Sequence, residues 1–318
     1  MSSCNNTTGV VVCLQGTDAP GVEPYHILKI IFGSLSILLN GSLLLAMYKE
    51  KKKLFASRVT YLVANLALAD FLIGVVLVFI IQPLEIHKRK PALKELELPL
   101  IWAAMLVSFL TLFLMSAERF VVVSLPMLWS SILTTRRTII GIGIIWCLAI
   151  IGGIVVHFHN FKAFFAMIIV IEFCVVVFII VHLYILRFLK KPNSETSLTD
   201  GDDEELQVTD VTTWPSAEQS NHVSMKQHGE VTAVVAILLA VLIFTMVPNF
   251  ICVQLFLAKI LIDDTALDGI DQNKLYLAFE YTDALSYLNF VVNPIVYAWR
   301  LRMYRRAFVK LFRSFCGA

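Results

Sequence analysis

The sequence predicts an all-α integral membrane protein, a seven-transmembrane helix bundle with a short amphipathic cytoplasmic helix after the seventh span. Composition is the first observation behind this prediction: of 318 residues, 58% are hydrophobic and only 16% are charged, and the mean hydropathy is +0.77. A soluble domain has about 25% charged residues. The second observation is that seven apolar stretches reach the roughly 20 residues that cross a bilayer. They cover 27–47, 59–81, 98–123, 139–156, 163–189, 231–257 and 275–298.

The Lys and Arg residues beside these spans predict the orientation, because such residues concentrate in cytoplasmic segments. The richer side carries four basic groups, at 49–58, 136–137, 187–191 and 300–313. The other side carries chiefly one patch, at 88–94. We therefore expect a multi-pass plasma-membrane protein whose N-terminal tail, 1–24, is extracellular and whose C-terminus is cytoplasmic. The spans and their connections, 25–299, form one membrane domain.

The N-terminal tail contains two kinds of candidate modification site. Asn5 and Asn6 each begin an Asn-X-Thr sequon, which is a glycosylation acceptor in an extracellular segment. Cys4 and Cys13 are the two cysteines on that side, and an oxidising compartment allows them to form a disulfide. No Cys or His spacing suggests a structural metal.

Two cytoplasmic segments differ from the spans. The acidic linker, 190–228, has low hydrophobicity and dense like charge, which predict disorder, and its hydroxyl residues precede acidic ones, as in sites of acid-directed kinases. The tail, 300–318, has apolar residues at steps of three and four with basic residues between them. We expect it to form an amphipathic helix against the anionic lipids of the inner leaflet. Cys316 near its end is a candidate for palmitoylation.

Polar side chains inside the spans are candidates for function, because they are costly in hydrocarbon. The ionisable ones are Asp70, Glu118, Arg119, Glu172, Glu280 and Asp283. The neutral ones include Asn40, Asn65, Ser108, Asn289 and Asn293. If several converge, a carboxylate with amide and hydroxyl oxygens would suit a hard cation. In the seventh span Pro294 frees a backbone carbonyl beside Asn293, which predicts a bendable polar segment.

Six motifs follow one another along the spans. They are Asn40, Leu-Ala-Leu-Ala-Asp ending at Asp70, Glu118-Arg119-Phe120 followed by Pro126, Trp146, Pro248, and Asn293-Pro294-Ile295-Val296-Tyr297. With these motifs the chain resembles a rhodopsin-like (class A) G-protein-coupled receptor over nearly its whole length. The resemblance implies a receptor and not an enzyme. Such a receptor passes the signal of an extracellular ligand to heterotrimeric G proteins by helix rearrangement, and kinases and arrestin would act at 190–228.

The resemblance also implies roles for residues at the matching positions. The switch that couples to the G protein would consist of Glu118, Arg119, Phe120, Pro248, Asn293, Pro294 and Tyr297. At rest Glu118 would hold Arg119. An allosteric Na⁺ would lie in a polar cluster made by Asn40, Asp70, Ser108, Asn289 and Asn293. We expect no other cofactor, no covalent chemistry and no nucleic-acid partner.

Several departures from the family bear on the subfamily. No cysteine starts the third span and none lies between the fourth and fifth spans, so the usual extracellular disulfide cannot form. The connection at 157–162 is also very short, which leaves little lid over the pocket. The fifth span lacks the usual proline, and Thr245-Met246 replaces the Cys-Trp pair before Pro248. The missing disulfide, the short connection and the proline-free fifth span together weakly resemble the melanocortin, cannabinoid and lysophospholipid receptor branch. Melanocortin receptors, however, usually carry Asp in place of Asn293 and keep the tryptophan before the proline.

The class of ligand is approached by exclusion within the family. Ile101 stands where amine receptors carry aspartate, and Tyr287 stands where opsins carry the retinal lysine, so a peptide or lipid is favoured over a monoamine. The candidate ligand-binding residues are Ile101, Glu172, Met246, Glu280, Asp283 and Tyr287. The alternative for Glu280 and Asp283 is that they cap the outer end of their helix in water.

Two other interpretations stay open. The absence of the usual tryptophan at Met246 is compatible with a ligand-independent or decoy receptor. A membrane transporter or channel could also use buried carboxylates. A transporter, however, usually shows internal repeats and broken helices, and the sequence has no evident repeated half.

Overall fold

The computed structural model describes residues 3–6, 11–14, 23–81, 91–125, 128–158, 161–190, 217–261 and 272–317. Pro126 and most of the linker at 190–228 lie outside these residues. The same holds for the side chains of Asn5, Asn6 and Cys316. The roles expected of these residues therefore stay predictions.

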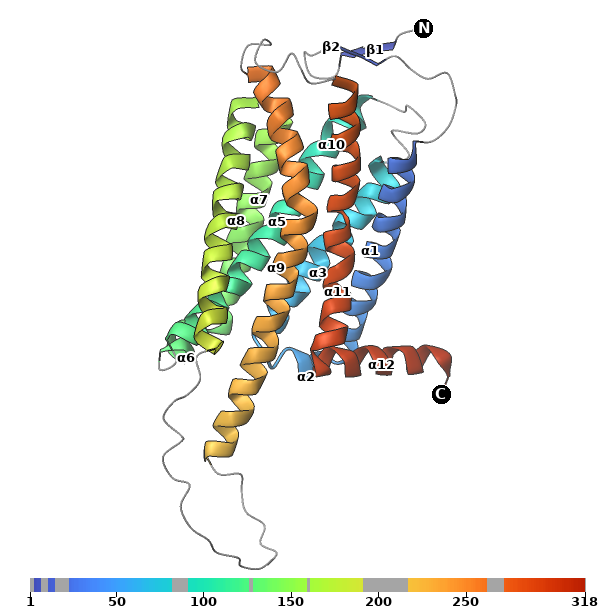
Figure 1. Cartoon of the computed structure of the whole chain (residues 1–318). Helices are drawn as coiled ribbons and strands as arrows, with labels where there is room; N and C mark the ends of the chain where they lie inside the picture. Colours follow the sequence, from blue (N-terminus) through green and yellow to red (C-terminus); the bar gives the residue numbers. More distant parts are fainter. Residues whose placement is uncertain are drawn as a thin grey trace, which may run out of the picture.

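The described part of the chain is almost entirely helical, and its long helices run side by side as a bundle (Figure 1). The helices are α1 Pro24–Lys49, α2 Lys51–Leu54, α3 Val59–Val75, the π-helical turn η1 Val76–Ile81, α5 Pro91–Ser124, α6 Trp129–Ile132, α7 Thr135–His157, α8 Phe161–Lys190, α9 Ala217–Leu261, α10 Gln272–Ser286, α11 Leu288–Arg300 and α12 Arg302–Cys316. This architecture confirms the predicted fold class.

Among the described helices, six are long and apolar enough to cross a membrane. The seventh predicted span, 275–298, is built from two shorter helices, α10 and α11, which follow one another end to end (Figure 1). Tyr287 separates them. Its N–H donates to the Ala284 carbonyl at 3.3 Å, and its carbonyl accepts from the Phe290 N–H at 3.2 Å. These three-residue turns carry the backbone through the break, so the two helices act as one span.

The proline in α11 explains one of the contacts between helices. Pro294 has no N–H, so it cannot donate to the carbonyl four residues earlier, which is that of Phe290. Asn40 in α1 fills the gap, since its Nδ2 donates to the Phe290 carbonyl at 2.9 Å. A backbone acceptor freed inside a membrane needs such a partner, because no water is available there. The hydrogen bond between Asn40 and the Phe290 carbonyl thus joins α1 to α11.

Small residues and one amide network set the spacing of the helices. A Cβ atom on Gly74 of α3 would lie 2.7 Å from the Gly33 carbonyl of α1, so these two helices approach at backbone distance. Asn65 of α3 connects that helix to two more: its Nδ2 donates to Thr111 Oγ1 at 2.7 Å, and its Oδ1 accepts from Trp146 Nε1 at 2.9 Å. Asn65 therefore fastens α3, α5 and α7 and has a packing role.

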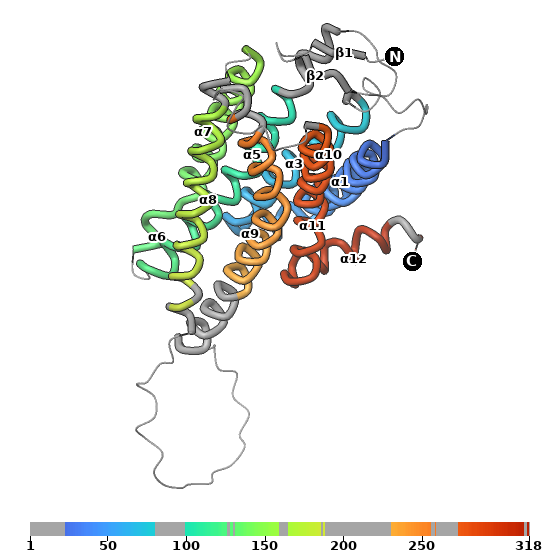
Figure 2. The backbone as a smooth tube through the Cα atoms, turned by 45° about the horizontal axis from the view of Figure 1, so that its top comes forward, coloured from blue at the N-terminus to red at the C-terminus, as the bar shows by residue number. Residues whose placement is uncertain are grey.

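Helix α12 lies across one end of the bundle (Figures 1 and 2). Its apolar side packs on the bundle through Tyr304 and Leu311, which are buried, while Arg305 is exposed. Tyr304 Oη donates to Thr60 Oγ1 at 3.1 Å, and burial raises the pKa of Tyr304 to about 12. Lys310 also pairs with Glu50 at 3.0 Å. The predicted amphipathic helix after the seventh span is thereby confirmed.

The sixth span differs from its expected bounds. Helix α9 begins at Ala217, so the last part of the linker, 217–228, is helical although the composition of 190–228 predicted disorder. These residues include Ala, Glu, Gln, Met and Lys and contain neither Pro nor Gly, which favours continuation of a helix already fixed in the membrane.

Two short strands, β1 Ser3–Asn6 and β2 Val11–Leu14, pair antiparallel in the N-terminal tail. Their register sets Cys4 opposite Cys13. Directly opposed residues of antiparallel strands have Cα atoms about 4.5–5.5 Å apart, which a disulfide can span. The disulfide stays a prediction, and this register favours it.

Candidate functional site

A central polar cluster lies where three helices meet around Asp70 of α3. Ser108 Oγ on α5 donates to Asp70 Oδ1 at 3.0 Å, and Asn293 Nδ2 on α11 donates to Asp70 Oδ2 at 2.6 Å. All three side chains are at most 1% exposed. A buried carboxylate thus holds these helices together through uncharged donors.

Asn40 and Asn289 complete the central polar cluster. Ser36 Oγ donates to the Asp70 backbone carbonyl at 2.8 Å, and Asn40 Nδ2 donates to Ser36 Oγ at 3.1 Å. Asn289 lies one turn before Asn293 and is fully buried. Among the described residues, neither Oδ1 nor Nδ2 of Asn289 has a hydrogen-bond partner, and the same is true of the Oδ1 atoms of Asn40 and Asn293. Buried polar atoms without partners are rare, so this cluster has oxygens to offer a further group.

The atoms of the central polar cluster fit a sodium ion. Within the described ranges no three His, Cys, Asp or Glu side chains gather as they would for a structural metal. A hard cation takes carboxylate, amide and hydroxyl oxygens instead. Asp70, Ser108, Asn289 and Asn293 carry those atoms. The structure therefore brings together the five residues for which the sequence predicted an ion site.

The predicted switch residue Arg119 is enclosed near the end of α5 that lies on the same side of the bundle as α12. Arg119 and Glu118 are each 4% exposed, and Arg119 Nη2 lies 3.9 Å from Glu118 Oε2, at the outer limit of an ion pair. Glu118 Oε1 also accepts a hydrogen bond from Thr138 Oγ1 of α7 at 3.0 Å. The carboxylate is thus shared between an arginine and a hydroxyl. Thr138 is a contributor that no sequence motif indicated.

The other predicted switch residues lie at separate points. Phe120 is 37% exposed, and its ring is 5.8 Å from that of Tyr184 on α8. Tyr297 is fully buried, and its ring lies 5.9 Å from that of Tyr304 on α12. Pro248 lies within α9. Phe120 thus packs toward α8 and Tyr297 toward α12.

A second polar group, the outer triad, consists of the buried Lys29 and Glu280 and the partly buried Asp283. Lys29 Nζ of α1 lies 2.8 Å from Glu280 Oε2 and 3.0 Å from Asp283 Oδ2 of α10. Asn249 Nδ2 of α9 adds a hydrogen bond to Asp283 Oδ1 at 3.3 Å. Glu280 is only 8% exposed, which argues against a cap in water. Sequence reasoning missed Lys29, although a lone ammonium group near the start of an apolar span was a signal that it needs an internal partner.

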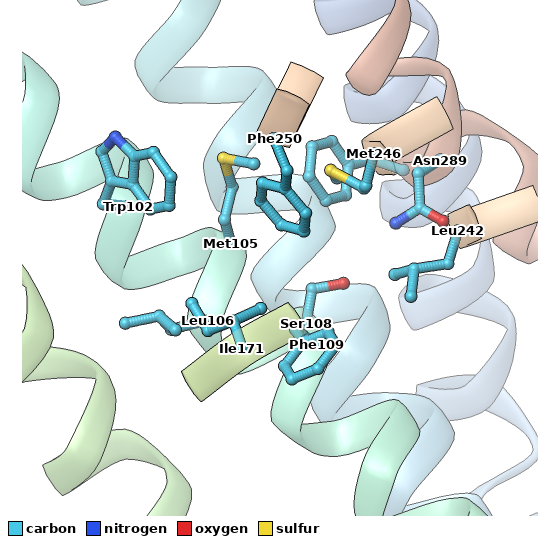
Figure 3. A pocket seen from close by; sticks show the side chains of 11 residues that line it. Trp102, Met105, Leu106, Ser108, Phe109, Ile171, Leu242, Met246, Phe250 and Asn289 are labelled. Carbon is cyan, nitrogen blue, oxygen red and sulfur yellow. The ribbon is translucent and has the colours of Figure 1, made fainter. Parts of the chain in front are cut away.

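An apolar cavity lies between α5, α8, α9 and α11. Its lining residues are Trp102, Met105, Leu106, Ser108, Phe109, Ile171, Leu242, Met246, Phe250, Asn289 and Phe290. Figure 3 shows Trp102 and Met105 on one side, opposite Met246 and Asn289. The volume of the cavity is about 20 Å³, enough for roughly one water molecule. Ser108 and Asn289 belong also to the central polar cluster, so the cavity ends on that cluster.

The cavity includes one of the six candidate ligand-binding residues, Met246. Ile101 and Tyr287 are buried in the core without lining it. Glu172 of α8 hydrogen-bonds Gln254 of α9, while its neighbour Ile171 lines the cavity. Successive helical residues point about 100° apart, which separates the two.

The lining residues that sequence reasoning missed did carry a signal. On α5 they recur at helical steps, at 102, 105, 106 and 109, and on α9 at 242, 246 and 250. This spacing marks one helix face. In a membrane span, however, the lipid-facing sides are also apolar, so the spacing alone could not tell which face turns inward.

Comparison with known proteins agrees with this geometry. The family described as 7 transmembrane receptor (rhodopsin family) matches residues 39–164. The chain is similar to Cannabinoid receptor 1 of Xenopus laevis, with 22% identity over 307 residues, which cover 91% of this chain and 63% of that receptor. The chain thus spans less than two thirds of the length of this relative. Taken with the helical bundle, these matches support the resemblance of the chain to the rhodopsin-like (class A) G-protein-coupled receptors, with a weak similarity to the cannabinoid branch.

Proposed function

We propose that the protein transmits an extracellular ligand signal to heterotrimeric G proteins by rearranging its helices. The observation that carries this proposal is Arg119, a buried guanidinium that meets Glu118 only at 3.9 Å. A guanidinium group held by one long ion-pair contact can leave that partner easily. A G protein offers it new partners once the helices open. The basic residues at 49–58 and 300–313 support an orientation in which this end faces the cytoplasm.

The proposed mechanism is a two-state equilibrium that the ligand and the G protein each bias. In the closed state Glu118 holds Arg119, and Thr138 holds Glu118. Opening separates α9 and α11 from α5, and Arg119 on α5 then leaves the neighbouring Glu118 carboxylate and turns toward the G protein. Pro294 supports bending of α11, because the Phe290 carbonyl it frees depends on a side chain and not on the helix.

Sodium would act through the central polar cluster. Asp70, Ser108, Asn289 and Asn293 would hold the ion, and its charge would balance that of the carboxylate. Because Asp70 bonds to both α5 and α11, an ion bound there favours the arrangement in which these helices stay together. Sodium would therefore oppose activation.

The lining of the cavity favours an apolar, lipid-like ligand, and the cavity of about 20 Å³ must widen to admit it. Nine of its eleven lining residues are apolar, the exceptions being Ser108 and Asn289, and no described lining residue is a carboxylate. A monoamine would need such a partner for its cation. The relative's name indicates cannabinoids, so these are the first compounds to test, followed by lysophospholipids.

A cationic peptide is the second candidate ligand, and the outer triad bears on it. Glu280 and Asp283 could meet a basic group of a peptide, but both already contact Lys29. A peptide would have to displace that ammonium group. This cost favours the apolar ligand over the peptide.

The test of the proposal is nucleotide exchange by a panel of purified heterotrimeric G proteins with the full chain in nanodiscs. We expect the wild type to raise exchange above the rate of the G protein alone, and the cannabinoid or lysophospholipid panel to alter it. Arg119→Ala should return exchange to the G-protein baseline. Arg136→Ala, which removes an exposed arginine of α7, is the matched control and should behave as wild type.

Other outcomes of the test point to the alternative functions. Exchange that is equal in wild type and Arg119→Ala would overturn the mechanism. No exchange with any G protein would favour a decoy receptor, and constant exchange without response to any ligand would favour a ligand-independent one. Ion current or solute uptake in liposomes without G protein would indicate a channel or transporter.

A further inference from the structure

A groove of about 480 Å³ opens at the end of α1, outside the helix bundle's core. Its walls are apolar: Leu44 and Met47 come from α1, Phe55 follows α2, and Ala64 comes from α3. The groove lies at the end of the bundle where α2 and α12 are located (Figure 1). An apolar groove on the outside of a membrane bundle is filled by lipid, so the question is which lipid fits it.

Two lysines border this groove. Lys51 and Lys52 of α2 are both exposed and both line it. The Lys51 ammonium group lies 5.5 Å from the centre of the Tyr48 ring. Within the described part of the chain, neither ammonium group has a carboxylate partner. Nearby Lys310, by contrast, pairs with Glu50 at 3.0 Å. The border of the groove is therefore cationic and uncompensated.

The position of the groove across the membrane suits its cationic border. Basic residues gather at 49–58 and 300–313, which by the positive-inside rule places the end with α2 in the cytoplasmic leaflet. That leaflet carries the anionic lipids, and basic pockets between membrane helices there bind anionic head groups. The walls are apolar where acyl chains lie, and the border is cationic where phosphates lie.

We propose that this groove binds one anionic phospholipid. An acyl chain lies along Leu44, Met47 and Ala64, and the anionic head group is held by Lys51 and Lys52. A free phosphate would use the lysines but leave the apolar wall empty, and a zwitterionic lipid would use the wall but gain less from two cations. The site is distinct from the basic face of α12, and it does not depend on which ligand or G protein the receptor uses.

The chain offers a matched control on the same four-residue helix. Lys53 lies on another side of α2, where it lines a separate pocket with Arg306 and Lys310 of α12. That pocket also contains Glu50, which already forms an ion pair with Lys310. Removing Lys53 and Arg306 lowers the charge by the same two units as removing Lys51 and Lys52, yet it leaves the groove intact.

The experiment measures lipid binding to the full chain in a neutral detergent by native mass spectrometry, with thermal unfolding as the check that each variant is folded. The probes are dioleoyl-phosphatidylserine, dioleoyl-phosphatidylcholine, and glycerophosphoserine, which has the head group without acyl chains. We expect one saturable phosphatidylserine site, weaker binding of phosphatidylcholine, and no competition by glycerophosphoserine.

Two sets of variants locate the site. Lys51→Gln with Lys52→Gln should weaken phosphatidylserine binding roughly 30-fold, about fivefold for each lysine, while Lys53→Gln with Arg306→Gln should change it by less than about twofold. Ala64→Leu fills the groove without altering charge and should also weaken binding. An equal loss in both double variants would mean attraction to charge alone and overturn the proposal. So would unchanged binding in Ala64→Leu, equal binding of phosphatidylcholine, or competition by glycerophosphoserine.

Discussion

The central polar cluster and the outer triad are both buried groups of carboxylates and polar side chains, yet they are built differently. Asp70 is met by neutral donors, from Ser108 and Asn293, and oxygens around it have no partner among the described residues. Glu280 and Asp283 are met by the ammonium group of Lys29. The first cluster thus has oxygens without partners that could meet an external cation, whereas the second contains its own cation. The partner, more than the carboxylate, decides whether a buried acid can sense an ion or only joins helices.

The largest effect is expected from Lys29→Met, which leaves the buried Glu280 and the partly buried Asp283 without a cation. Breaking a buried ion pair from one side costs about 3–5 kcal/mol. We expect the unfolding free energy of the detergent-solubilised receptor to fall by this amount. The combination with Glu280→Gln and Asp283→Asn should recover most of the loss, because no charge is then stranded. If Lys29→Met unfolds as the wild type does, the outer triad does not hold α1 to α10.

A smaller loss is expected from Asn40→Ala. It removes the donor to the Phe290 carbonyl, and an unsatisfied buried acceptor costs about 1–3 kcal/mol of unfolding free energy. Adding Pro294→Ala restores an N–H that can bond Phe290 within the helix, so the double variant should be more stable than Asn40→Ala alone. If the stability losses of Asn40→Ala and Pro294→Ala simply add in the double variant, Asn40 does not compensate for the proline.

The smallest effect, and the one that most directly contrasts the two clusters, is sodium dependence. Thermal unfolding in NaCl against choline chloride should show stabilisation of about 1 kcal/mol in the wild type when the sodium concentration is about five times its dissociation constant. Asp70→Asn should abolish it, since the carboxylate is lost while an oxygen remains. Glu280→Gln should keep it. Loss of the sodium effect in both variants would remove the distinction between the clusters.

The bundle could be predicted from the hydropathy of the sequence, and a buried polar cluster from the polar residues inside the spans, while the membership of that cluster came from the family resemblance. Spans of about 20 apolar residues fix the helices, and few polar residues occur inside them, so Asp70, Asn289 and Asn293 had few other partners. The outer triad could not be found in this way. Lys29 and Glu280 are 251 residues apart, and nothing in either segment shows that α1 and α10 are neighbours.

Rotation of the helices about their own axes was the other missing information. Glu172 is polar and inside a span, yet it faces Gln254, and the cavity is lined by Ile171 beside it. The same uncertainty hid Thr138, a residue of no motif, which turns toward Glu118. The start of α9 at Ala217 was hidden by acidic composition in the preceding part of the linker.

The central claim is that Glu118 holds Arg119 in the closed state, and the measurement that tests it most directly is basal nucleotide exchange by Glu118→Gln. Glutamine keeps an oxygen for the Thr138 hydrogen bond and removes only the charge that faces Arg119. The account predicts a rise in basal exchange of about fivefold or more, corresponding to at least about 1 kcal/mol of coupling. It also predicts that Arg119→Ala in the same chain cancels the rise. Unchanged exchange in Glu118→Gln, or a rise that persists without Arg119, would contradict the account.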